Sequence, residues 1–204
     1  MRSVETGEEI QLSQDGEALY DYATLLPSPR EMIRQGTTKP MLPVAATWSP
    51  DSKKLLTYRI DQRKAGRFHW IQFAPPGGGR PLLYSCAYPL PGEIDLPKAE
   101  PLIFDVEKRK QIQVDSESHP MLYYGSPDRI PPYGLCWGED SQQIYFQLLE
   151  RGYNALKLRV TDASKGQTRT IVDERAGHPY MSTVDRILPH QNNRTNIFPI
   201  LNII

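Results

Sequence analysis

Apolar and polar residues alternate over short stretches of this chain, and one phrase marks the ends of three such stretches. In each copy a large apolar residue stands three positions before an Asp, a Gly or Ser follows the Asp, and an aliphatic residue stands four positions after it. The Asp side chain can bond the backbone two residues on, and the small residue tolerates turn dihedrals, so the phrase predicts a strand, a tight turn and a second strand. The copies span 12–19, 48–55 and 137–144.

A second repeat consists of a strand, a polar turn and an alternating strand, which together form an outer hairpin. It spans 4–12, 104–114 and 160–172. In chain order the repeats read outer hairpin, corner, corner, outer hairpin, corner, outer hairpin, an order typical of four-stranded antiparallel blades around an axis. We therefore expect an all-β fold, a partial β-propeller of about three blades that is truncated at both ends.

Prolines and glycines interrupt the chain between the blades. The stretch 74–100 is predicted to form two long connections that flank a strand near Leu82 to Ala87, and 118–134 is a further connection. A helical start is seen only at 28–34, with Ser28 as N-cap and Pro29 at the first helical position. The propeller segment is expected to span 1–182, and 183–204 is expected to form an irregular tail outside the fold.

Composition excludes several classes of protein. The chain has 204 residues, 39% of them hydrophobic, which is enough to bury a core. It contains no run of about 18 apolar residues, the length that could cross a bilayer. Basic and acidic residues both number 24, so no net charge attracts nucleic acid. Cys86 and Cys136 lie in apolar strand-like segments and are interpreted as buried thiols rather than a disulfide. No secretory signal follows Met1, and the compartment stays open.

Three motifs carry a family resemblance. They are a Trp-Ser-Pro-Asp strand over 48–61, Tyr-Pro-Leu-Pro-Gly at 88–92, and a hydrophobic strand ending in Asp-Val at 105–106. In combination they resemble the N-terminal β-propeller domain of the dipeptidyl peptidase IV family of prolyl oligopeptidase-type serine peptidases. The resemblance covers roughly residues 4–182.

The resemblance implies a parent enzyme in which the propeller adjoins a C-terminal α/β-hydrolase domain, admits peptide substrates and could form a homodimer. The nucleophile elbow of such domains is Gly-x-Ser-x-Gly. None of the 14 glycines here has a serine two positions on, so we expect no catalytic residue in this chain and no activity from the chain alone.

The resemblance also implies a substrate-binding feature, a Glu pair on a short helical insertion before the Trp-Ser-Pro phrase, which holds the substrate's ammonium group. A buried ammonium needs such carboxylates because its desolvation is costly. The matching segment here carries single acids, Asp21 and Glu31, and this departure leaves the cleavage specificity open. The adjacent Glu8 and Glu9 are interpreted as solvated charges in an outer hairpin turn.

Other candidate sites have ordinary structural explanations, and we expect neither a metal nor a cofactor. The histidines His69, His119, His178 and His190 have no metal-ligand spacing. The triplet Gly77-Gly78-Gly79 precedes Arg80-Pro81 instead of a helix, so it predicts a hairpin loop.

Three further groups of side chains leave alternatives open. The charged residues Arg59, Asp61, Arg63 and Lys64 read as a solvated strand end, with a channel or interface position as the alternative. Trp48 and Trp137 are interpreted as blade core, with ligand platforms as the alternative. The tyrosines Tyr123, Tyr124 and Tyr133 could offer a peptide-binding surface or pack between blades.

The sequence therefore predicts a propeller segment of a serine-type dipeptidyl peptidase that takes part in proteolysis by gating access to a catalytic domain absent from this chain. The alternative is a non-enzymatic propeller that serves as a binding or scaffold module.

Overall fold

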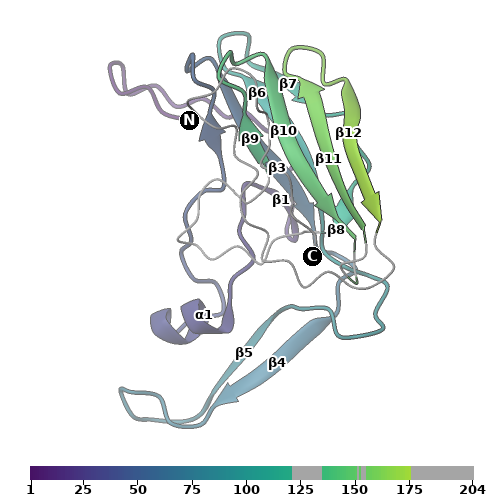
Figure 1. The fold of residues 1–204 in the computed structure, drawn as a ribbon. Coiled ribbons are helices and arrows are strands. Elements are labelled where there is room, and N and C mark those ends of the chain that lie inside the picture. The colour runs from purple at the N-terminus through teal and green to yellow at the C-terminus, as the bar shows by residue number, and fades with distance from the viewer. Residues whose placement is uncertain (121–134, 151, 153–154, 176–204) are drawn as a thin grey trace.

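The computed structural model describes residues 1–120, 135–150, 152 and 155–175, and within them the fold is mostly antiparallel β (Figure 1). The elements in chain order are β1 (Tyr20–Tyr22), α1 (Pro29–Gln35), β2 (Thr47–Trp48), β3 (Lys54–Asp61), β4 (Arg67–Gln72), β5 (Leu82–Ala87), β6 (Lys98–Asp105), β7 (Lys110–Gln113), β8 (His119–Pro120), β9 (Leu135–Trp137), β10 (Gln143–Leu149), β11 (Ala155–Asp162) and β12 (Thr168–Arg175).

The first sheet is built around β3 and β6, which pair antiparallel along their whole length from Lys54↔Asp105 to Asp61↔Lys98. β1 and β2 pair with β3, while β7 and β8 pair with β6. The second sheet is a four-stranded antiparallel meander in the order β12-β11-β10-β9. Each sheet therefore has the four-strand-wide antiparallel form that the repeats predict for a blade.

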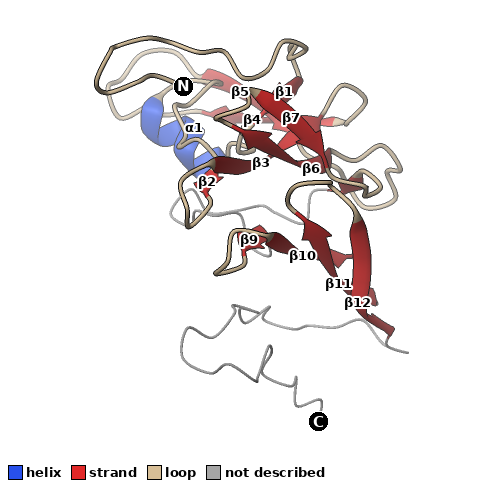
Figure 2. Ribbon diagram, turned by 90° about the horizontal axis from the view of Figure 1, so that it is seen from above, coloured by secondary structure: helices blue, strands red, loops and turns tan. Residues whose placement is uncertain are grey.

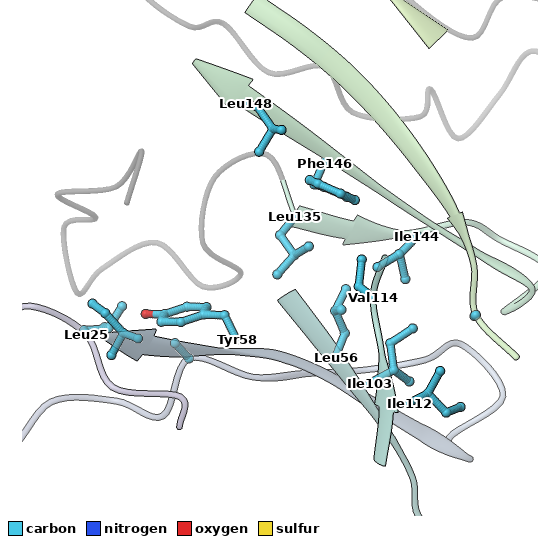
Figure 3. Close-up of a cluster of buried hydrophobic side chains, with 13 residues drawn as sticks. Leu25, Leu56, Tyr58, Ile103, Ile112, Val114, Leu135, Ile144, Phe146 and Leu148 are labelled. Carbon is cyan, nitrogen blue, oxygen red and sulfur yellow. The ribbon is translucent and has the colours of Figure 1, made fainter. Parts of the chain in front are cut away.

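The two sheets form separate layers, as Figure 2 shows, with an apolar core between them. Leu56 and Ile103 of the first sheet lie in one buried cluster with Ile144 and Phe146 of the second (Figure 3). Every second residue of β10 enters this cluster, because successive strand residues point to opposite faces. Burial of these large aliphatic and aromatic side chains is the main force that holds the layers together.

Polar contacts fix how the layers sit on each other. The indole Nε1–H of Trp137 donates to the carbonyl of Thr47 at 3.1 Å, and the Asp51 N–H donates to Ser141 Oγ at 3.0 Å. The Asp51 bond joins the two corner phrases, and the Trp137 bond joins the third phrase to Thr47, the residue directly before the second phrase. The repeat thus forms the contact between sheets as well as the turn within each sheet.

Several predictions from the sequence are confirmed. The second and third corner phrases join β2 to β3 and β9 to β10, and the second and third outer hairpins are β6–β7 and β11–β12. The strand expected near 82–87 is β5, and the helix expected at 28–34 is α1. Both cysteines are free thiols as predicted, although only Cys86 is fully buried and Cys136 is half-buried.

Other predictions need correction. The first corner phrase is followed by β1 but has no strand before it, since Leu12 lies outside any strand. Asp15 accepts hydrogen bonds from Tyr22 and Arg59 instead of closing a turn. The described residues accordingly form two blade-like sheets and a separate hairpin, not three blades. Trp48, expected in a core, is 49% exposed. The expected boundary at 182/183 lies outside the described residues and stays a prediction.

Candidate functional site

An insertion interrupts the edge of the first sheet. β1 and β2 pair one after the other with the same strand, through Tyr22↔Arg59 and Thr47↔Leu56, and residues 23–46 leave the sheet between them. The Ala45 N–H donates to the carbonyl of Ala23 at 2.9 Å, which closes the base of the excursion. The insertion therefore projects from one point on the sheet edge, and it carries the helix α1 (Figure 1).

Local signals determine where this helix begins and ends. The Ser28 side chain accepts a hydrogen bond from the Glu31 N–H, and Pro29 occupies the first turn, where its missing N–H costs nothing. Gly36 ends the helix in the left-handed conformation at φ +64°, which glycine adopts without steric cost. These two caps place Glu31 in the first turn.

Glu31 is the most unusual side chain of the insertion. It is only 7% exposed, and its Oε2 is buried without a hydrogen-bond partner among the residues that the structure describes. A carboxylate removed from water is costly unless a cation or donor meets it. The geometry therefore suits an ammonium group or another donor supplied by a ligand.

A two-stranded hairpin lies against α1. β4 and β5 pair from Arg67↔Ala87 to Gln72↔Leu82 and form a sheet of their own, which we call the arm. Met32 of α1, 1% exposed, packs in one cluster with Tyr84 and Cys86 of the arm, and Trp70 covers that cluster. Figure 1 shows α1 and the arm together beyond the end of the two sheets.

Arg59 is the centre of a partly buried ionic cluster, which corrects its assignment to a solvated strand end. Its side chain is 16% exposed and contacts Glu100 at 2.7 Å and Asp15 at 2.8 Å. Its guanidinium lies 4.5 Å from the ring centre of Tyr20 and 5.8 Å from that of Tyr22. Contacts of this kind hold β1, where the insertion starts, onto β3.

The protonation states of this cluster follow from its contacts. Burial opposes the charge on Arg59, but the hydrogen bond and charge of Glu100 outweigh it, so the pKa of Arg59 is raised. The hydrogen bond that Tyr22 donates to Asp15 at 2.6 Å lowers the pKa of the Asp15 carboxyl. Burial is the main cause of the raised pKa of Tyr22. Arg59 and Asp15 are therefore both charged near neutral pH while Tyr22 keeps its proton, and the cluster is structural in character.

The neighbouring charged residues agree with the sequence interpretation. Arg63 is an exposed partner of Asp61 at 2.8 Å, and Lys64 is exposed. Glu8 and Glu9 are exposed, and Glu8 lies 3.6 Å from Arg109 across the surface. Asp21 is half-buried in β1, and its Oδ1 has no hydrogen-bond partner within the described part of the chain.

The remaining candidates show no ligand chemistry. The glycine triplet lies in the loop of the arm, where Gly78 and Gly79 have φ values of +74° and +97°. His69 is exposed on the arm, and His119 lies in β8. Burial raises the pKa of the Cys136 thiol to about 11, so it is not a reactive thiolate.

No metal-binding group of three or more His, Cys, Asp or Glu side chains occurs in the described ranges. No helix among the described residues is long and apolar enough to cross a membrane. Five residues singled out in the sequence lie outside the described part, and they are Tyr123, Tyr124, Tyr133, His178 and His190.

Comparison with known proteins gives one family match. Residues 42–201 match the family model described as the dipeptidyl peptidase IV (DPP IV) N-terminal region. Among curated proteins, a probable dipeptidyl-aminopeptidase B from Phaeosphaeria nodorum is 28% identical over 138 residues, which are 64% of this chain and 15% of that protein. The chain therefore spans less than one-sixth of that relative's length.

Two solved structures share the fold. Dipeptidyl peptidase 4 from Porphyromonas gingivalis superposes with a TM-score of 0.59 at 16% identity, covering 87% of this chain and 23% of that one. A putative dipeptidyl aminopeptidase IV from Bacteroides ovatus gives a TM-score of 0.56 at 15% identity, covering 82% and 22%. At this level of identity the likeness concerns the fold alone.

Proposed function

The chain belongs to the dipeptidyl peptidase IV N-terminal region family, and from this membership we propose that it is the propeller segment of a serine-type dipeptidyl peptidase. Its parent would carry the Ser, Asp and His of an α/β-hydrolase domain that follows this segment. The segment takes part in proteolysis in two ways, by gating access to that domain and by holding the substrate's N-terminus. Peptides with a free N-terminus are the expected substrates.

The observation that carries this proposal is the buried carboxylate of Glu31. It sits on a short helix in an insertion before the Trp48 phrase, where the family resemblance implies an ammonium-binding Glu pair. Its Oε2 lacks a hydrogen-bond partner among the described residues, which is expected of a group that binds a ligand. We assign the ammonium contact to Glu31, which acts here without a neighbouring Glu.

An activity measurement on the complete gene product tests the proposal. Chromogenic Xaa-Pro substrates are compared with a free and with a blocked N-terminus, with and without a serine-directed covalent inhibitor. We expect inhibitor-sensitive hydrolysis that prefers the free N-terminus. A complete gene product with no Gly-x-Ser-x-Gly elbow and no hydrolysis of either substrate would overturn the proposal.

Gating also predicts that the rate of hydrolysis depends on the size of the substrate. If peptides must pass the propeller to reach the active site, short unblocked peptides are hydrolysed and folded proteins with the same N-terminal residues are not. Equal rates per free N-terminus for a short peptide and a folded protein would contradict gating.

The second candidate is a non-enzymatic binding or scaffold module, and the outer face of the arm favours it. Ile71 and Leu83 are cross-strand neighbours that are 48% and 63% exposed, and Phe73 beyond them is 76% exposed. Exposed apolar residues grouped in this way are typical of association surfaces. Both strands of the arm also lack a second neighbour among the described strands, so a second copy could pair along them.

We assign a homodimer to this face, and measurement of molar mass in solution tests it. Leu83→Glu should shift the complete gene product from dimer to monomer, whereas Ile94→Glu, at an exposed site off the arm, should not. A wild-type monomer at micromolar concentration would refute the homodimer.

A further inference from the structure

The arm has two faces of different character. Residues that alternate along a strand point to opposite sides, so Trp70 and its cross-strand partner Tyr84 share one face, while Ile71 and Leu83 share the other. The first face is covered, since Tyr84 is 2% exposed and packs with Met32 of α1. The second face is open to solvent. Only the inner face of the arm therefore contacts the insertion.

The helix on this inner face cannot be stable by itself. α1 has seven residues, and isolated helices shorter than about 12 residues are marginal in water even with good caps. The buried residues of α1 are Glu31 and Met32. Met32 belongs to the cluster with the arm and not to the core between the two sheets. Packing on the arm is therefore the apolar contact that orders α1, beside the two hydrogen bonds between Gln35 and Met41 of the insertion.

The arm in turn presents a rigid surface to the helix. The rings of Trp70 and Tyr84 are stacked with centroids 5.7 Å apart and an interplanar angle of 10°, and the Tyr84 hydroxyl donates to Gln72 Oε1 at 2.9 Å. These contacts restrict both rings to one arrangement. Because Met32 directly follows Glu31 in the first turn, any shift of the helix on this surface also moves the Glu31 carboxylate.

We propose that Trp70 and Tyr84 are positioning residues that set where α1 holds the carboxylate of Glu31. The assignment of a peptide ammonium as the ligand of that carboxylate rests on the function proposed above. The mechanical link between the arm and the helix does not depend on that function. Substrate affinity is thereby coupled to the packing of a hairpin that belongs to neither sheet. The two parts of the proposal have separate tests.

Hydrogen exchange of the chain tests the mechanical link. In Trp70→Ala, the amides of Met32, Gly36 and Thr37, which are bonded to carbonyls within and next to α1, should exchange at least about tenfold faster. Ile71→Ala is the matched control, one residue away on the outer face, and should leave them unchanged. Trp70→Phe should restore most of the protection because it keeps an aromatic ring against Tyr84 and the cluster that contains Met32. Unchanged exchange in Trp70→Ala overturns the proposal.

Steady-state kinetics of the complete gene product test the effect on the substrate. Trp70→Ala should raise KM for an unblocked Xaa-Pro substrate by about tenfold, the loss expected for a misplaced charge-assisted hydrogen bond, and should leave KM for the blocked substrate unchanged. Trp70→Phe should restore KM, and Ile71→Ala should not alter it.

Glu31→Gln separates the possible failures. If Glu31→Gln raises KM for the unblocked substrate and Trp70→Ala does not, the positioning role is wrong and the proposed function stands. If neither variant alters KM, the ammonium contact at Glu31 is wrong, and the proposed positioning of it fails as well. A complete gene product without peptidase activity overturns the proposed function, and the exchange measurement then decides the link between arm and helix.

Discussion

Replacing Gly166 with alanine should loosen the contact between the two sheets. Gly166 lies between β11 and β12 with φ +75°, and its carbonyl accepts a hydrogen bond from the Asp115 N–H at 2.8 Å, just beyond β7. A Cβ added at Gly166 would lie far inside van der Waals contact with the backbone carbonyl oxygen of Gln113. Because backbone on both sides has to move, the alanine can be accommodated only if the turn leaves the first sheet.

The chain offers a matched control for the backbone strain alone. Gly78 has φ +74°, and a Cβ added there would meet nothing within 4 Å. Both alanine variants carry the left-handed strain of about 1 to 2 kcal/mol. Gly166→Ala also forfeits the hydrogen bond from Asp115, worth about 1 kcal/mol, and disturbs nearby packing on Ile112. We expect it to lower the free energy of unfolding by at least about 2 kcal/mol more than Gly78→Ala does.

Urea unfolding followed by far-ultraviolet circular dichroism measures the difference. A Gly166→Ala chain without a cooperative transition, beside a Gly78→Ala chain that retains one, also meets the expectation. Equal destabilisation by the two substitutions would refute the close approach of the β11–β12 turn to the first sheet.

Three further outcomes are expected from the same unfolding measurement. Arg59→Met should cost about 2 to 3 kcal/mol because it leaves Glu100 without its cation, and adding Glu100→Gln should recover part of that loss; additive effects would contradict the ion pair. The backbone N–H of Lys108 donates to the Asp105 carboxylate and is the main reason that the pKa of Asp105 lies below its ordinary value of 3.8. The ionised carboxylate therefore stabilises the folded state above about pH 4, and this stabilisation is lost as the pH falls through the lower pKa of the folded state. Asp105→Asn should therefore destabilise at pH 7 and approach the wild type near pH 2, and a pH-independent difference would contradict this. Ile144→Ala, at a fully buried site, should cost about 3 kcal/mol, against about 0.5 kcal/mol or less for the exposed Ile171→Ala; similar costs would argue against the core between the sheets.

Local chemistry made much of the fold predictable. The corner phrases at Asp51 and Asp140 have strands on both sides because alternating apolar residues follow each turn, and the turn itself needs only Asp and a small residue. The helix at 29–35 was predictable from Ser28 and Pro29 because capping depends on neighbouring residues alone.

What the sequence could not supply depends on contacts between distant segments. Asp15 stands in a phrase that resembles a corner, yet Arg59, 44 positions away, and Tyr22 recruit its carboxylate. Trp48 and Trp137 occupy equivalent repeat positions, but they differ in their surroundings. Among the described residues, Trp137 donates a hydrogen bond to Thr47 of the neighbouring sheet, whereas Trp48 is 49% exposed.

The candidate site was visible in the sequence only in part. The segment around Glu31 was identified from the resemblance, but the burial of Glu31 could not be foreseen from seven helical residues. The strand β4, which contributes Trp70 to the arm, escaped the sequence interpretation because only its partner β5 was identified. The alternation of polar and apolar residues from Arg67 to Trp70 was the signal that could have revealed it.

The most direct test of the account is the effect of Glu31→Gln on the complete gene product. Glutamine keeps the size of the side chain and removes its charge, so kcat/KM for an unblocked Xaa-Pro substrate should fall about tenfold or more. The value for the same substrate with a blocked N-terminus should not change. An equal kcat/KM for the unblocked substrate in wild type and variant would contradict the assignment of the ammonium contact to this chain.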